Sequence, residues 1–275
     1  MAEALDAGVE LAAVYLEPDA AEHPVVERCR RVGAQIREVQ PGVLARALDL
    51  ASPRAVVAVG VQRTVPLDTV LDAAVRHRRP VLALVGLQDP GNAGTLLRVA
   101  EAAGCAGVVV TTGSVDVHNP KTVRATAGSL FRLPVAEGVD AGQLRVEATA
   151  RDIPTWATVR DAGVSLDSAD LTGPSILLVG SEAHGLPDEL RAVADGLLSI
   201  PMEGGVESLN AAVAGALVAF EAARQRRADG VTGTVSRGSA SDCGATNELG
   251  HDVDRPAASR GSGSGVDQGA EERST

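Results

Sequence analysis

Three segments of the chain carry polar side chains where an apolar run meets a loop or the start of a helical pattern. They contain amides, a guanidinium, a carboxylate and a hydroxyl, so together they offer hydrogen-bond donors and acceptors to a polar ligand. The residues are Asn92 and Arg98 in the first segment, Glu182 in the second, and Ser208 and Asn210 in the third. An ordinary helix cap also explains the third segment, because serine is common at helix starts and needs no ligand there.

The patterns around these residues predict elements that would bring them together. Residues 81–86 and 175–180 are apolar runs typical of buried strands. A polar loop over 87–94 and a helix over 95–103 follow the first run, and a helix from Ser208 to about Arg227 begins at the third segment. Ligands of open α/β sheets bind at the carboxyl ends of the strands, and free N–H groups at a helix start favour polar ligands. We therefore expect the three segments to form one site.

The same segments resemble the three ordered motifs of the SpoU/TrmH RNA methyltransferases of the SPOUT superfamily. The matching stretches are Gly91–Arg98, Leu178–Leu186 and Ile200–Asn210, and they follow one another in the family's order. Residues 119–135 resemble the family's linking segment between the first two motifs, and the likeness covers about residues 80–228. Each motif alone has low specificity, so the resemblance rests on all three occurring in sequence.

The expected fold is α/β. Strands near residues 81, 108, 133, 155, 176 and 198 alternate with helices, which predicts an open, mainly parallel sheet. The resemblance implies a trefoil knot, in which the segment that carries the third motif is threaded so that three loops fold around S-adenosylmethionine. It also implies a homodimer. Val213, Leu217, Phe220 and Ala223 recur at helical spacing in the final helix and could form the dimer face. The same helix could instead pack only inside its own subunit.

The resemblance also implies catalytic roles in methyl transfer to a ribose 2′-hydroxyl. Arg98 matches the residue thought to act on that hydroxyl; because an arginine pKa above about 12 makes it a poor proton acceptor, we expect it to stabilise the developing alkoxide and the adjacent phosphate. A salt bridge on the helix surface is the structural alternative for Arg98. Asn92 would orient the loop or the ribose, and Glu182, Ser208 and Asn210 would support the methionyl end of the cofactor and the site geometry.

Cofactor contacts are expected from four further positions in the second and third motifs. Gly180, Ile200, Met202 and Leu209 would give backbone and apolar contacts to the adenosine of S-adenosylmethionine. Gly180 lies at the end of an expected strand, where the absence of a side chain would admit a ligand.

Three regions are expected along the chain. Residues 1–76 predict a small α/β domain, similar in position to the ribosomal-protein-like RNA-recognition domain of one branch of the family, but lacking that domain's first strand. This domain could alternatively do no more than pack against its neighbour. Residues 77–228 would form the methyltransferase domain, and residues 229–275 are rich in Gly, Ser, Asp and Glu, which predicts a disordered acidic tail.

Composition limits the partners. The net charge is −11, of which −4 lies in residues 229–275, so residues 1–228 are also acidic. Binding of RNA would therefore require arginines such as Arg98, Arg124 and Arg132 to gather on one face. The three cysteines lack metal-site spacing, which predicts neither zinc nor disulfides. No signal peptide or membrane-length apolar run is present, so we expect a cytoplasmic protein without membrane partners.

Three classes of function remain open from the sequence. The favoured one is an RNA ribose 2′-O-methyltransferase, acting on ribosomal RNA rather than transfer RNA because of the type of its front domain. A catalytically inactive RNA-binding or ribosome-assembly factor with the same fold is the second. The third is another nucleotide-dependent α/β enzyme using residues 91–94 as a phosphate loop, although these residues have neither dinucleotide-type glycine spacing nor a Gly-Lys-Ser/Thr ending.

Overall fold

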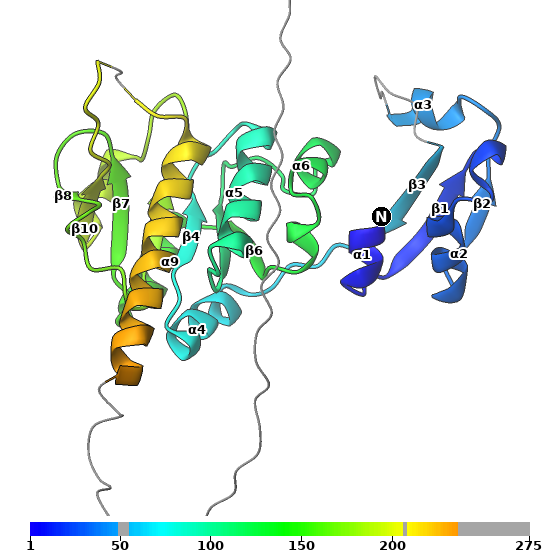
Figure 1. Ribbon diagram of the computed structural model, residues 1–275. Coiled ribbons are helices and arrows are strands. Elements are labelled where there is room, and N and C mark those ends of the chain that lie inside the picture. Colours follow the sequence, from blue (N-terminus) through cyan, green and yellow to red (C-terminus); the bar gives the residue numbers. More distant parts are fainter. Residues whose placement is uncertain (49–54, 206–207, 236–275) are drawn as a thin grey trace, which may run out of the picture. The chain divides into compact units, whose positions relative to one another are not determined.

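The computed structural model describes residues 1–48, 55–205 and 208–235, and Figure 1 labels its helices and strands. The first part of the chain forms a three-stranded sheet in the order β2-β1-β3, with β1 parallel to β2 and antiparallel to β3. Helices alternate with strands in this part of the chain. They are α1 (Ala2–Asp6), β1 (Leu11–Leu16), a short 3-10 turn (Pro18–Ala20), α2 (Pro24–Arg31), β2 (Ile36–Glu38), α3 (Val43–Leu48) and β3 (Val56–Gly60).

The second part forms a seven-stranded sheet in the order β6-β5-β4-β9-β7-β10-β8. Every pairing within it is parallel, which confirms the predicted α/β fold with a mainly parallel sheet. Its elements are α4 (Leu67–His77), β4 (Val81–Leu84), α5 (Pro90–Ala102), β5 (Gly107–Thr111), α6 (Pro120–Ala125), a 3-10 turn (Ser129–Phe131), β6 (Val135–Val139), α7 (Ala141–Thr149), β7 (Thr155–Val159), β8 (Val164–Ser165), β9 (Ile176–Val179), α8 (Asp188–Val193), β10 (Gly196–Ser199) and α9 (Ala211–Val235).

Hydrophobic side chains on both faces of the large sheet are buried. Successive residues of a strand point to opposite faces, so Leu82 and Leu84 of β4 join the core beneath α5 and α9, while Val81 and Ala83 join the core beneath α4, α7 and α8. This two-sided burial explains why β4 and β9 are continuous apolar runs in the sequence. It also gives the sheet a rigid centre, from whose strand ends the motif loops extend.

Helix α5 begins earlier than the sequence pattern predicts. Asp89 caps it by accepting a hydrogen bond from the backbone N–H of Asn92 at 2.7 Å, and Pro90 occupies its first turn. Residues 91–94 therefore belong to the helix, and the prediction of a polar loop as far as Gly94 is wrong. An Asp-Pro pair is itself a helix-start signal, because proline suits the first turn, where its missing N–H would have no partner.

The final helix also differs from its predicted limits. Helix α9 begins at Ala211 rather than Ser208, and it continues to Val235, past the predicted domain end at residue 228 and into the segment 229–275 predicted as a tail. The remainder of that predicted tail, from residue 236, lies outside the described residues. Within the described part of the chain, no helix is long and apolar enough to span a membrane.

Helix α4 crosses the expected domain boundary after residue 76, and its apolar face packs with the large sheet. Its apolar side chains Leu67, Val70, Leu71 and Ala74 are buried in the same core as Val81 and Ala83 of β4. The backbone N–H of Val65 also donates to the carbonyl oxygen of Val135 at the start of β6, at 3.0 Å. Packing therefore groups α4 with the second part of the chain.

Strand order places two of the motif loops side by side. Strand β4 lies between β5 and β9, and Leu84 pairs with Val179, so β4 and β9 end at the same edge of the sheet. Helix α9 lies beside α5 (Figure 1), and a Cβ on Gly215 of α9 would be only 2.4 Å from Leu96 Cδ2 of α5. The start of α9 is therefore close to the start of α5, at the edge where β4 and β9 end.

Candidate active site

A chain of hydrogen bonds joins the three motifs. Asn92 Nδ2 donates to Glu182 Oε1 at 2.7 Å, and Asn210 Nδ2 donates to Asn92 Oδ1 at 3.1 Å. Glu182 and Asn210 are exposed and Asn92 is half-buried, so a ligand could reach the polar groups from solvent. The structure thus brings together Asn92, Glu182 and Asn210, one from each of the three segments.

Two helix caps fix the amides of this chain. Asp89 holds the first turn of α5 and thereby the backbone of Asn92. Asn210 Oδ1 accepts from the N–H groups of Ala212 at 2.9 Å and Val213 at 3.2 Å, which caps α9 and leaves Nδ2 free to donate to Asn92. The ordinary cap expected at this helix start therefore exists, but Asn210 provides it. Ser208 is exposed and makes no side-chain hydrogen bond to the described residues.

The loop that carries Glu182 folds back on itself. Ser181 and Gly185 exchange two backbone hydrogen bonds, at 3.1 and 2.9 Å. A Cβ on Gly180 would lie 2.2 Å from the carbonyl carbon of Gly185 and 2.4 Å from the nitrogen of Leu186. The sequence predicts that Gly180 leaves room for a ligand, whereas the atoms that exclude a side chain there belong to the protein's own backbone. A larger residue at Gly180 would therefore distort this loop, so a loss of cofactor affinity in such a variant would not show that Gly180 contacts the cofactor.

Side chains from β5 and the following turn support the loop after β4. Thr111 Oγ1 and Ser114 Oγ each donate to the carbonyl oxygen of Leu84 at 3.2 Å. Gln88 Nε2 donates to the carbonyl oxygens of Gly86 and Gly113. Neither these positioning residues nor Asp89 is among the residues predicted from the sequence. Only Asp89 has a recognisable sequence signal, because it precedes Pro90.

Arg98 is not part of the hydrogen-bonded chain. It lies six residues after Asn92 on α5, which places it about 9 Å further along the helix and on a different face. Its side chain is exposed, and it forms no ion pair or side-chain hydrogen bond with the residues that the structure describes. The alternative of a surface salt bridge therefore has no support in this part of the chain, and the guanidinium is available to a ligand.

The other two arginines expected to form a basic face differ from each other. Arg132 binds the carboxylates of Glu101 and Glu3, so its charge is compensated. Arg124 is exposed on α6 and has no ion pair within the described ranges. Of the three arginines, Arg98 and Arg124 are thus the ones whose charge is not compensated by a carboxylate in the described part of the chain.

The expected cofactor residues suit a ligand with an apolar end and a charged end. Ile200, Met202 and Leu209 are half-buried in the segment between β10 and α9, and Ile200 packs against the core beside α9. Asn92, Glu182 and Asn210 supply carboxylate and amide groups at the neighbouring loops. Apolar contact for an adenine ring and polar contact for an amino-acid group are both present in this donor set, so the residues fit S-adenosylmethionine.

A separate polar cluster is formed by Asp116 and His118, which follow β5, and by Glu137 on β6. His118 Nδ1 is 3.0 Å from Glu137 Oε1 and 3.9 Å from Asp116 Oδ1. The Glu137 carboxylate raises the pKa of His118 above its usual value, although burial alone would lower it. A carboxylate–imidazole pair of this kind is a charge interaction that operates near neutral pH.

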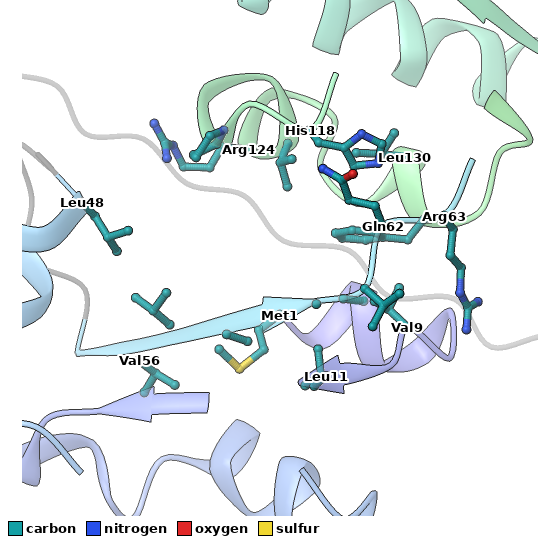
Figure 2. A pocket seen from close by; sticks show the side chains of 18 residues that line it. Met1, Val9, Leu11, Leu48, Val56, Gln62, Arg63, His118, Arg124 and Leu130 are labelled. Carbon is teal, nitrogen blue, oxygen red and sulfur yellow. The ribbon is translucent and has the colours of Figure 1, made fainter. Parts of the chain in front are cut away.

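The described part of the chain contains a hollow of about 460 Å³, and Figure 2 shows the side chains that line it. Its walls include apolar side chains such as Val9, Leu11 and Val56, together with His118 and Arg124. None of the nine site residues expected from the sequence lines it. The hollow is therefore separate from the hydrogen-bonded chain of the three motifs.

In this parallel α/β sheet, polar loops meet beyond the ends of the adjacent strands β4 and β9. Proteins of this class bind a ligand where the strand order of the sheet changes direction. The family model that matches this chain, over residues 79–220, is that of the SpoU rRNA Methylase family. The chain belongs to this family.

Named relatives agree with this assignment. A 23S rRNA (uridine(2479)-2′-O)-methyltransferase of Streptomyces viridochromogenes is 38% identical over 143 residues, which are 50% of this chain and 50% of the relative. The 23S rRNA (guanosine-2′-O-)-methyltransferase RlmB of Xanthomonas axonopodis pv. citri is 34% identical over 74% of this chain and 82% of the relative. The match thus spans half the length of the first relative and most of the second.

A solved structure shares the fold. The SpoU methyltransferase AviRb from Streptomyces viridochromogenes, in complex with the cofactor AdoMet, superposes with a TM-score of 0.72 at 30% sequence identity. The superposition covers 82% of this chain and 87% of that chain. The likeness therefore extends beyond the region matched by the family model.

Proposed function

We propose that this protein transfers a methyl group from S-adenosylmethionine to a ribose 2′-hydroxyl of ribosomal RNA. The observation that carries the proposal is the hydrogen-bonded chain Glu182–Asn92–Asn210, because it unites all three family motifs in one solvent-accessible place. The AdoMet complex of AviRb and the named 23S rRNA methyltransferases support the cofactor and the substrate class.

The protein's own residues would position the substrate and stabilise charge. When bound, S-adenosylmethionine would supply an electrophilic methyl group on a sulfonium. The transfer would form a bond from the ribose oxygen to the methyl group, break the S–CH₃ bond of the cofactor and release the hydroxyl proton to water. Asn92, Glu182 and Asn210 would hold the loops and the amino-acid end of the cofactor, with Ser208 nearby. Ile200, Met202 and Leu209 would contact the adenosine, and the backbone at Gly180 would border it. Arg98 would stabilise the alkoxide and a neighbouring phosphate, a task that suits a planar, permanently charged guanidinium.

The other two functional classes fit less well. A phosphate loop at residues 91–94 needs accessible backbone, yet Gly94 is buried and a Cβ there would lie 2.4 Å from Ala125 Cβ. An inactive RNA-binding factor would not need the intact polar chain of the three motifs. The relatives' names favour ribosomal RNA, and transfer RNA remains the alternative substrate.

The first part of the chain is proposed to recognise RNA. The packing of α4 with the large sheet supports a division between Gly60 and Leu67 instead of after residue 76. The cytoplasm is the proposed location, since ribosomal RNA is the proposed substrate. Residues beyond Val235 are proposed to have no catalytic role.

We further infer a trefoil knot and a homodimer. In the sheet, β7 separates β10 from β9. The helix that follows β10, α9, nevertheless packs against α5 and β9, as a threaded C-terminal segment would require. Val213, Leu217 and Phe220 on α9 are 47%, 43% and 45% exposed, while Ala223 is buried. The exposed apolar stripe supports a second copy of this chain as its partner.

Single-turnover methylation with saturating enzyme tests the proposed function, after 2′-O-methylation has been mapped in total RNA from cells with and without the gene. Arg98→Ala should lower the rate by about a hundredfold, as loss of one transition-state donor does, with little change in S-adenosylmethionine affinity. Arg98→Lys should rescue poorly, because a point charge cannot replace a planar fork. Isothermal titration with NAD and ATP gives the negative controls. No difference in the methylation maps, or a near-normal rate for Arg98→Ala, would contradict the proposal or the role of Arg98, respectively.

A further inference from the structure

Three arginines converge near the end of α5 that lies away from the candidate active site. Arg79 precedes β4, and Arg226 and Arg227 lie on α9. Together with residues 102–104 at the end of α5 they line a hollow of about 290 Å³. Arg79 and Arg227 are exposed and Arg226 is half-buried. Since α5 has 13 residues, this hollow is about 20 Å from the start of the helix, where Asn92 lies.

Arg226 is fixed in this hollow by the protein. Its Nη2 donates to the carbonyl oxygen of Ala103 at 2.9 Å, which satisfies the end of α5. Its Nη1 is buried and has no hydrogen-bond partner in the described part of the chain. Burial lowers the pKa of Arg226, and the charges of Arg79 and Arg227 lower it further. The three positive charges are thus close enough to repel one another.

No protein carboxylate among the described residues forms an ion pair with these three arginines. Acidic residues on the same helices have other partners, since Glu101 binds Arg132 and Glu221 binds Arg224. In a chain with a net charge of −11, a cluster of like positive charges without an ion-pair partner is an exception. Such a cluster is stabilised when an external anion lies against it.

We propose that Arg79, Arg226 and Arg227 form a second RNA-contact surface, which binds backbone phosphates of the substrate RNA away from the methylated nucleotide. This inference rests on the proposed function, because it assigns the RNA a further point of contact. Guanidinium forks match phosphate geometry, and phosphate contacts position RNA without reading its sequence. A large folded RNA can reach both this surface and the active site, which a single nucleotide cannot.

The test compares RNA binding by matched variants of the full chain. The double variant Arg79→Ala/Arg227→Ala removes two charges and leaves Arg226 to hold the end of α5. Arg224→Ala is the control, because Arg224 is exposed on the same helix but paired with Glu221 at 2.7 Å. A 23S rRNA transcript is titrated at several salt concentrations. The double variant should bind about tenfold more weakly at low salt, and the slope of log affinity against log salt should fall by about 2.

The possible failures are distinguishable. If the double variant binds the transcript as Arg224→Ala does, with the same salt slope, the second surface is wrong while the proposed function stands. If the wild-type protein neither binds nor methylates ribosomal RNA, the proposed function itself fails. Unchanged S-adenosylmethionine affinity and melting temperature in the double variant are required to attribute its loss of RNA binding to the surface.

Discussion

Asn210 uses the two ends of one amide for different tasks. Its Oδ1 caps α9 through Ala212 and Val213, and its Nδ2 donates to Asn92. A helix cap and a site residue are often treated as competing explanations of a polar residue at a helix start. Here one side chain fulfils both, because an amide carries an acceptor and a donor that point in different directions.

Asn210→Asp separates the two tasks of this residue. Aspartate caps helices as well as asparagine does, so the melting temperature should stay within about two degrees of the wild-type value. The new carboxylate cannot donate to Asn92 Oδ1, and turning the Asn92 amide would break its bond to Glu182. Methyl transfer should therefore fall by about tenfold or more. Asn210→Ala, which loses both contacts, should be slow and also less stable; an Asp variant with wild-type rate would exclude the site role.

His118 and Glu137 predict a pH-dependent contribution to stability. The pKa of His118 is raised in the folded protein, mainly by the Glu137 carboxylate, so protonation stabilises the fold. This stabilisation is fully present below the unfolded value of about 6.5 and is lost as pH rises through the higher folded value. Glu137→Gln should therefore lower the melting temperature more at pH 6 than at pH 9.

Glu147→Gln is the control for this pH effect. Glu147 pairs with Arg151 at 2.6 Å, and arginine stays charged across the range. Its substitution should lower the melting temperature equally at both pH values. A Glu137→Gln effect that is equally independent of pH would show that the imidazole does not titrate against this carboxylate.

At the scale of elements, the sequence predicted the kinds of helices and strands well and their starts less well. The buried strands were readable because both faces of β4 and β9 are apolar. The start of α5 was misread because residues 91–94 contain two glycines, which are typical of loops. Gly94 is there for packing: α6 lies so close that a Cβ at this position would be 2.9 Å from the carbonyl oxygen of Thr122. Contacts between helices far apart in sequence are not visible in local patterns.

Gly94→Ala should destabilise the protein although alanine favours helices. The added methyl would lie 2.4 Å from Ala125 Cβ, so α6 must move. Overpacking of this kind costs about 1–3 kcal/mol, against a gain of about 1 kcal/mol in helix propensity. Because Asn92 lies in the same turn, S-adenosylmethionine affinity should fall as well. Denaturant unfolding and isothermal titration measure the two effects.

Gly173→Ala provides the matched control for this substitution. Apart from its two chain neighbours, no described residue has an atom within 4 Å of a Cβ at Gly173. Its unfolding free energy should stay within about 0.5 kcal/mol of the wild type. If Gly94→Ala is as stable as this control, close packing does not explain the glycine of the first motif.

At the scale of the whole molecule, the sequence predicted an open parallel sheet but not its strand order. The site depends on that order, because β4 and β9 are neighbours in space although their paired residues, such as Val81 and Ile176, are 95 positions apart. Local patterns do not specify pairing between strands so far apart, and only the resemblance to the family implies that the motif loops meet. The apolar pattern of α9 likewise did not reveal which residues face inward. Val218, Ala219 and Ala222 are buried, whereas Val213, Leu217 and Phe220 are exposed.

The exposed stripe on α9 predicts a dimer that one charge should break. Leu217 lies between Val213 and Phe220 at helical spacing, so a glutamate there would be desolvated in any interface formed by this face. Leu217→Glu should convert a dimer to a folded monomer, because the inward side chains of α9 are unchanged. Sedimentation or light scattering at micromolar concentration measures the mass. Val146→Glu on α7, where the valine is 67% exposed, adds the same charge to another surface and should leave the dimer intact. A monomeric wild-type protein, or a Leu217→Glu variant that stays dimeric, would show that this face of α9 is not the interface.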